Sequence, residues 1–143
     1  MRSIIFHLAF PVADIPQTKQ FYGEGLGCQV GRETSASVIL NLYGNQLVAH
    51  VTHQPLAIQQ GIYPRHFGLV FTELGEWESL RDRCQTHQLE FFQQPKQRFV
   101  GDITEHYTFF LSDPFHNLLE FKHYIHFESV FGAREFGLVG DRI

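Results

Sequence analysis

Two of the nine histidines in this 143-residue chain stand in matching surroundings. His7 lies in the stretch FHLAF and His66 lies in RHFGL, and each precedes an acidic residue, Asp14 or Glu73, by seven positions. Imidazole nitrogens at equivalent places of a repeated pattern are typical of a site for a divalent transition metal. The spacing therefore predicts a metal site to which each half of the chain contributes one histidine.

Glu120 is the carboxylate that best completes such a set. Side chains alternate between the two faces of a strand, so on the last predicted strand Leu119 and Phe121 point toward the core and Glu120 points the other way. A buried carboxylate without a cationic partner is costly, and a metal ion supplies that partner. We expect His7, His66 and Glu120 to hold one divalent ion, with positions left open for water, substrate or dioxygen.

His50 occupies the place of Glu120 in the first half when residues 43–50 (YGNQLVAH) are aligned with 113–120 (DPFHNLLE), at an offset of 70 positions. In that place His50 could be a fourth ligand, or an acid–base group beside the metal, because imidazole exchanges protons near neutral pH. The alternative is a partly exposed histidine near a strand end with no chemical role.

The elements that must position these residues repeat along the chain: a strand, a helix and three strands occur twice. In the first half we predict a strand at 3–12, a helix over 14–26, and strands at 28–33, 36–43 and 45–52. In the second half we predict a strand at 64–72, a helix at 73–88, and strands at 89–93, 106–112 and 117–124. This duplication predicts an α+β fold of two βαβββ modules, 1–53 and 64–124, with a linker at 54–63 and a tail at 125–143.

The connection at 93–108 (QQPKQRFVGDITEHYT) is predicted to be a polar lid at the mouth of the site. Lys96 and Arg98 could hold a substrate carboxylate there, and the alternative is an ordinary solvated loop. The tail keeps four apolar residues that we expect to pack on the domain or on a dimer partner: Phe127, Val130, Phe131 and Phe136.

The amino-acid composition indicates which kinds of molecule the protein can bind. The formal net charge is −4 and no run of like charges exceeds two residues, which argues against nucleic acid or an anionic membrane as the main partner. No apolar stretch approaches 18 residues, and Cys28 and Cys84 have no partner at metal-ligand spacing. We therefore expect a cytoplasmic protein that acts on a small molecule.

Three stretches resemble the vicinal oxygen chelate superfamily, which includes glyoxalase I, extradiol dioxygenases, fosfomycin-inactivating thiol transferases and bleomycin-binding proteins. They are HLAFPVADIPQTKQFYGEGLGCQV at 7–30, RHFGLVF at 65–71 and FFLSDPFHNLLEF at 109–121. The last is similar to the recurrent motif Phe-x-Asp-Pro-x-Gly-Asn-x-x-Glu, with His116 in place of the glycine. The resemblance implies paired modules that form a cupped mixed sheet with helices on the outside, with His7, His66 and Glu120 as the metal ligands. It also implies a homodimer in which His7 could come from the partner subunit.

The branches of the superfamily differ around these ligands. Glyoxalase I has a glutamate where this chain has His50, and the fosfomycin enzymes follow the first ligand with Leu-Thr, where this chain has Leu8-Ala9. Extradiol dioxygenases share the His/His/Glu set and a catalytic histidine on the fourth strand, which His50 would match. Their seventh-strand tyrosine falls at Phe110 here, a candidate substrate contact, with Tyr107 or His106 as candidate catalytic substitutes.

The resemblance thus implies a metal-dependent enzyme, dioxygenase-like, whose small substrate binds the ion through adjacent oxygens. Fe(II) is the first candidate ion, and Ni, Zn, Mn or Co are the alternatives. A glyoxalase-type lyase or isomerase, a thiol transferase, and a non-enzymatic ligand-binding protein remain the alternative functions.

Overall fold

A computed structural model describes residues 3–142 and contains the predicted repeat twice. The first module consists of β1 (His7–Val12), the helix α1 (Ile15–Thr18) and its continuation η1 (Lys19–Gly25), β2 (Gln29–Glu33), β3 (Ser37–Leu42) and β4 (Asn45–Val51). The second consists of β5 (Phe67–Val70), α2 (Leu74–Thr86), β6 (Phe91–Arg98), β7 (His106–Ser112) and β8 (Leu118–Tyr124), followed by the short helix η2 (Phe127–Val130). The α+β fold of two βαβββ modules is confirmed.

The first helix begins where the sequence indicates. The Asp14 side chain accepts a hydrogen bond of 2.8 Å from the Gln17 backbone N–H, and Pro16 occupies the first turn. The helix then widens into a π-type turn over η1, and the chain leaves it at Gly27, whose φ of 91° favours glycine. This turn brings Phe21 and Tyr22 into the core.

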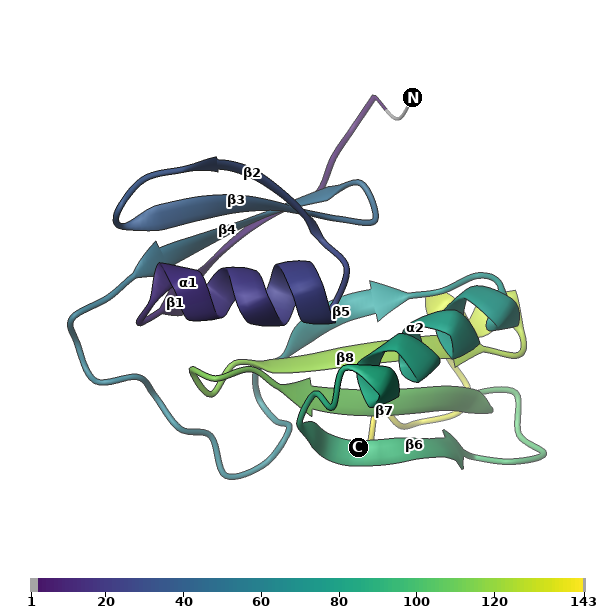
Figure 1. Ribbon diagram of the computed structural model, residues 1–143. Coiled ribbons are helices and arrows are strands. Elements are labelled where there is room, and N and C mark those ends of the chain that lie inside the picture. Colours follow the sequence, from purple (N-terminus) through teal and green to yellow (C-terminus); the bar gives the residue numbers. More distant parts are fainter. Residues whose placement is uncertain (1–2, 143) are drawn as a thin grey trace.

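The strands form two four-stranded sheets, ordered β1-β4-β3-β2 and β5-β8-β7-β6. In each sheet the first and last strands of the module pair in parallel, and the remaining pairs are antiparallel. One continuous cupped sheet would place β1 beside β5, but within this chain each of these strands is the edge of its own sheet (Figure 1).

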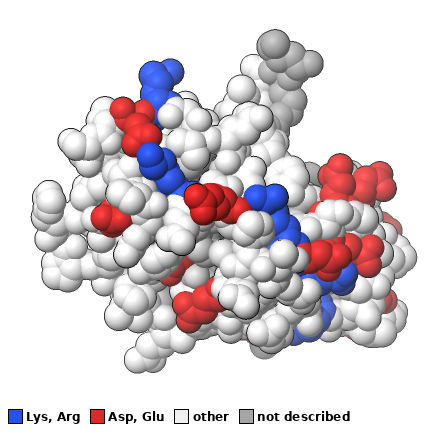
Figure 2. Space-filling view, in the orientation of Figure 1, with Lys and Arg blue, Asp and Glu red and all other residues white. Residues whose placement is uncertain are grey.

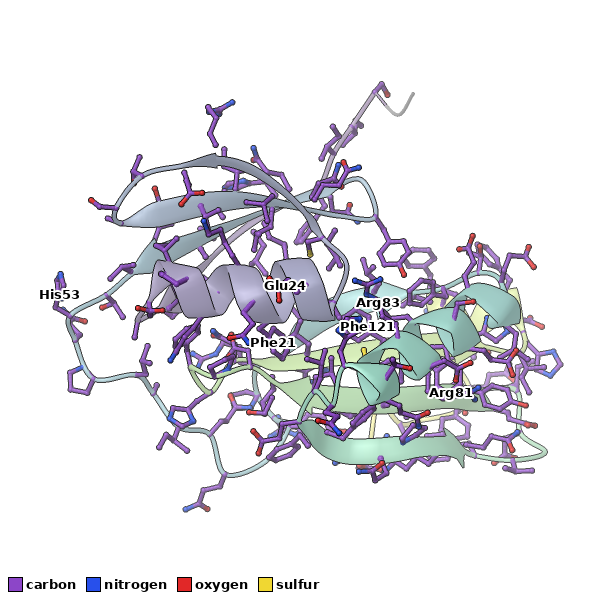
Figure 3. All side chains as sticks on the ribbon, viewed as in Figure 1. Phe21, Glu24, His53, Arg81, Arg83 and Phe121 are labelled. Carbon is purple, nitrogen blue, oxygen red and sulfur yellow. The ribbon has the colours of Figure 1, made fainter. Side chains whose placement is uncertain are left out.

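One hydrophobic core joins the two modules. The Phe10 ring contacts Tyr22 at 5.2 Å and Phe67 of the second module at 5.3 Å between ring centroids. The Tyr22 hydroxyl donates to Asp113 at 2.7 Å, and the Arg83 guanidinium donates to the backbone oxygens of Glu24 and Gly25 (Figure 3). The apolar side of each sheet is therefore buried in this shared core.

β6 is longer than predicted, which corrects the extent of the lid. The strand runs to Arg98, so only residues 99–105 connect it to β7. The strand continues through Pro95, although proline donates no hydrogen bond. β6 is an edge strand, however, and its pairing with β7 shifts register between Gln93 and Lys96, where proline is tolerated.

The tail folds back over the second module. The Phe136 ring packs on Phe99 at 5.1 Å, and Arg98 forms an ion pair with Asp141. Phe127 and Phe131, two of the expected apolar anchors, are exposed instead. The tail thus covers the second sheet but leaves apolar side chains on the outside.

The turn before β8 keeps its geometry despite its unusual residue. His116 adopts a φ of 69°, the left-handed conformation that glycine favours. The Asp113 side chain holds the turn by accepting the backbone N–H groups of Phe115 and Asn117, each at 2.8 Å.

Acidic and basic side chains are interspersed over the face seen in Figure 2, with broad uncharged areas between them. None of the helices formed by residues 3–142 combines the length and apolar character needed to cross a membrane.

Candidate metal and substrate site

His66 and Glu120 meet on one face of the second sheet. His66 immediately precedes β5, and Glu120 pairs with Gly68 in the parallel ladder between β5 and β8. The His66 Nε2 atom lies 3.2 Å from Glu120 Oε1. Gly68 permits this approach, because a Cβ at its position would lie 1.7 Å from the Glu120 backbone oxygen.

Each of these two side chains is oriented by a further hydrogen bond. His66 Nδ1 lies 2.7 Å from the Ile62 carbonyl oxygen, which can only accept, so Nδ1 carries the proton and Nε2 faces Glu120 with its lone pair when the ring is neutral. Thr108 Oγ1 donates to Glu120 Oε2 at 2.6 Å, and Lys122 Nζ lies 3.8 Å from Oε1. Such outer contacts are what fix metal ligands in place.

The electrostatics favour an ionised carboxylate. Burial opposes the charge of Glu120, but the hydrogen bond from His66 and the charge of Lys122 outweigh it and hold the pKa of Glu120 below its usual value. The hydrogen bond to Glu120 raises the pKa of His66, against the opposing effect of burial. A negative oxygen and an imidazole nitrogen therefore converge on one point.

The pair opens into a cavity of about 280 Å³ between the sheet and the tail. Phe110 packs edge-on against His66, with ring centroids 5.1 Å apart, and Tyr63 lies 6.3 Å from His66 on the same measure. Basic side chains also line the cavity: Arg98, His106 and Lys122. The volume is near the lower end of the range for small-molecule sites.

His7 and His50 lie on the first sheet. Both are exposed, and His7 Nδ1 is hydrogen-bonded to Gln46 Oε1 at 2.7 Å. Among residues 3–142 of a single chain, no three His, Cys, Asp or Glu side chains converge in a way that could hold a metal ion. The chain therefore brings together two of the three predicted ligands.

The strand register corrects the alignment of the two halves. Ala9 pairs with Val48, and its counterpart Gly68 pairs with Glu120. The counterpart of Glu120 is therefore Val48, and His50, which pairs with Pro11, corresponds to Lys122, which pairs with Val70. An ungapped alignment missed this because two residues connect β3 to β4, whereas five connect β7 to β8.

The remaining predicted residues divide between the two sides of the sheet. His106 and Phe110 face the cavity, whereas Tyr107 packs on Trp77 at 5.4 Å on the helix side and does not line the cavity. Arg98 lines the cavity, and Lys96 is exposed outside it. Burial lowers the pKa of His106, whose Nδ1 donates to the Thr104 carbonyl oxygen at 2.8 Å.

Sequence reasoning missed two residues of the site, Tyr63 and Thr108. Strand alternation places Lys122 on the cavity side with Glu120, and it could also have found Thr108, which stands two positions from Phe110. Tyr63 lies in the linker, where no periodic pattern gives its direction.

Two βαβββ modules, with a histidine–carboxylate pair on the second sheet, define the class of protein to which this chain belongs. The chain belongs to the Glyoxalase/Bleomycin resistance protein/Dioxygenase superfamily, whose family model matches residues 4–121. Members of this superfamily commonly bind divalent metals. The donors present here, one imidazole nitrogen and one ionised carboxylate, fit such an ion.

Solved structures agree with this assignment. A glyoxalase/bleomycin resistance protein/dioxygenase from Alicyclobacillus acidocaldarius is 36% identical with a TM-score of 0.85, covering 90% of this chain and 97% of that one. The fosfomycin resistance protein FosX from Listeria monocytogenes is 15% identical (TM-score 0.68, covering 90% and 99%). A lactoylglutathione lyase from Agrobacterium tumefaciens is 16% identical (TM-score 0.65, covering 92% and 98%). The last two share the fold. The search of curated proteins gave no match.

Proposed function

We propose that this protein is a metal-dependent enzyme whose small substrate binds the ion through two adjacent oxygens. The ion would be held by His66 and Glu120 of one chain and by His7 of the second chain of a homodimer. The observation that carries the proposal is the approach of His66 Nε2 to Glu120 Oε1 at 3.2 Å, with both side chains held by further hydrogen bonds at the wall of a cavity.

The arrangement of the two sheets supports a site shared between two chains. His7 is on the exposed side of β1, an edge strand, and β5 beside His66 is the edge strand of the other sheet. Bringing β1 of one chain beside β5 of another would complete the ligand set and cover both open faces. Val48, the counterpart of Glu120, is apolar, so the first module would contribute a single ligand.

When bound, a divalent ion would act as a Lewis acid that lowers the pKa of a coordinated substrate hydroxyl. Lys122 is well placed to stabilise the resulting oxyanion, because its Nζ lies 3.8 Å from Glu120. Phe110 closes the cavity against His66 and would exclude water from the reacting oxygens. His50, the counterpart of Lys122, keeps its proposed acid–base role, supplied like His7 from the first module of the second chain.

We place dioxygenation of a catechol, with Fe(II), first among the reactions, because three protein ligands leave room for both substrate and dioxygen. A lyase or isomerase reaction with Ni, Zn, Mn or Co is the second candidate. It is favoured by one observation: an apolar ring, Phe110, occupies the cavity wall next to His66, where the dioxygenase pattern has a tyrosine.

Metal content after purification without chelator tests the site. We expect about one ion per wild-type chain, and loss of the ion in His7→Ala, His66→Ala and Glu120→Gln. His53→Ala is the matched control, because His53 lies on an exposed loop away from the cavity (Figure 3). Full metal content in His66→Ala and Glu120→Gln would refute the proposal.

Activity measurements separate the two reactions. Anaerobic loading with Fe(II) followed by a catechol panel should give oxygen uptake if the first is right. If instead only the Ni, Zn, Mn or Co forms act, on methylglyoxal with glutathione, the second is right. Metal-loaded protein that turns over neither kind of substrate would contradict both.

A further inference from the structure

The cavity continues away from His66 and Glu120 along rows of cross-strand neighbours. The first row pairs Phe110 with Glu120, the second pairs Thr108 with Lys122, and the third joins Arg98, His106 and Tyr124. A strand rises about 3.3 Å per residue, so the third row lies roughly 13 Å from the first. A ligand that reaches both rows must be elongated.

Arg98 stands in the distant row, and a carboxylate already pairs with it. Its side chain is 14% exposed, and its guanidinium lies 4.8 Å from the Phe99 ring. The partner is Asp141, which comes from the end of the tail and is 59% exposed. Asp141 is also joined to Tyr63, because its backbone N–H donates to the Tyr63 hydroxyl at 2.8 Å.

Without Asp141, the side chains that line the cavity carry more positive than negative charge. Two basic side chains, Arg98 and Lys122, line it, whereas Glu120 is its one carboxylate among the described residues. A metal ion would add further positive charge. The walls between the two ends are mainly aromatic, formed by Tyr63, Phe99, Phe110, Tyr124 and Phe136.

We infer that the substrate carries a carboxylate at the end opposite to its two chelating oxygens, joined by a flat apolar body. This inference rests on the proposed function. Arg98 binds that carboxylate, because a guanidinium matches a carboxylate with two parallel hydrogen bonds. Asp141 occupies the same position in the free protein, so the tail competes with the substrate and is displaced by it.

Calorimetric titration of the metal-loaded protein tests this with two matched probes. Dihydrocaffeate has a catechol and a remote carboxylate, whereas propylcatechol has the same ring without the charge. We expect dihydrocaffeate to bind about tenfold more tightly, the factor typical of one charge-assisted hydrogen-bonded pair. Equal dissociation constants for the two probes would overturn the inference.

Variants of the ion pair then assign the effect. Arg98→Gln should remove the preference for dihydrocaffeate and leave propylcatechol binding unchanged. Asp141→Asn should tighten dihydrocaffeate binding about threefold, because an exposed competing ion pair is lost. The controls are Arg134→Gln and Glu135→Gln, exposed tail residues outside the cavity that change the same charges. Identical effects of Asp141→Asn and Glu135→Gln would exclude competition by the tail.

Phenylpropanoate, which has no chelating oxygens, separates this inference from the proposed function. Titrated into metal-free protein, it should bind weakly, more tightly to Asp141→Asn and not to Arg98→Gln. If neither catechol binds but phenylpropanoate follows this pattern, the carboxylate site stands and the metal function fails. If both catechols bind only with metal and Arg98→Gln changes nothing, the function stands and the carboxylate site fails.

Discussion

At the scale of single residues, the arrangement around Glu120 shows how one carboxylate is prepared for a cation. Both of its oxygens are engaged: Oε2 accepts from Thr108, and Oε1 faces His66 and Lys122. Thr108 is fully buried, so water does not compete for its hydroxyl in the folded protein. The carboxylate is therefore held in one orientation before any ion binds.

Thr108→Val should weaken metal binding. Valine keeps the shape of threonine but cannot donate to Glu120, so the carboxylate loses its fixed orientation. We expect a loss of metal affinity of about 10- to 100-fold, measured by competition with a chelator. Thr34→Val, on an exposed turn, is the control, and unchanged affinity in Thr108→Val would show that Glu120 is held by other groups.

His106 should make the stability of the metal-free protein depend on pH. Burial lowers the pKa of His106 in the folded state, so below the ordinary histidine pKa of about 6.5 the unfolded chain binds this proton more readily. The contribution of His106 to the free energy of unfolding should therefore fall as the pH drops from 7.5 to 5.5, whereas His66, whose pKa is raised, contributes in the opposite direction. In denaturant unfolding at the two pH values, His106→Asn should gain stability relative to the wild-type protein as the pH drops, and parallel profiles would contradict this origin.

At the scale of elements, strand alternation predicted which side of the second sheet carries His66 and Glu120, because apolar residues fill the alternate positions Phe67, Leu69, Leu119 and Phe121. It could not give the register between strands, which depends on the length of the connecting turns. His50 was consequently aligned two positions away from its structural counterpart. The sequence also did not show that β6 is an edge strand, and the predicted strand 89–93 ended before Pro95, whereas β6 continues to Arg98.

Gly68→Ala should separate β5 from β8. The added methyl group would overlap the Glu120 backbone oxygen. This oxygen belongs to the strand that pairs with β5, so the clash could be relieved only by moving the two strands apart. We expect a loss of at least about 2 kcal/mol in the free energy of unfolding. Gly75→Ala in α2 is the matched control, because nothing lies within 4 Å of its new methyl group and alanine favours a helix. Equal stability of the two variants would contradict the close approach.

At the scale of the whole molecule, the helices and the apolar sides of both sheets form one core, so the polar sides of the sheets remain open within a single chain. The duplicated pattern in the sequence predicted two modules, but it contains no information about which module faces which. That choice depends on contacts such as Phe10 with Phe67 and Tyr22 with Asp113, which join residues far apart along the chain.

Mixing two inactive variants tests whether the ligands are shared between chains. In a heterodimer of His7→Ala and His66→Ala chains, one site would carry both changes and the other would carry neither. We expect mixed dimers to recover about half of the wild-type metal content per dimer, measured after co-expression with two affinity tags. Metal-free heterodimers would mean that each site uses ligands from its own chain.

The edge strands β2 and β6 also affect where a strand of another chain can pair with the sheets. Pro95 removes a backbone donor from β6, and β2 is interrupted by an irregular register between Val30 and Glu33. Both features discourage another strand from adding there. In the homodimer proposed above, strand addition would therefore use only the edges formed by β1 and β5, so association would end with a closed pair of chains and would not continue into a fibre.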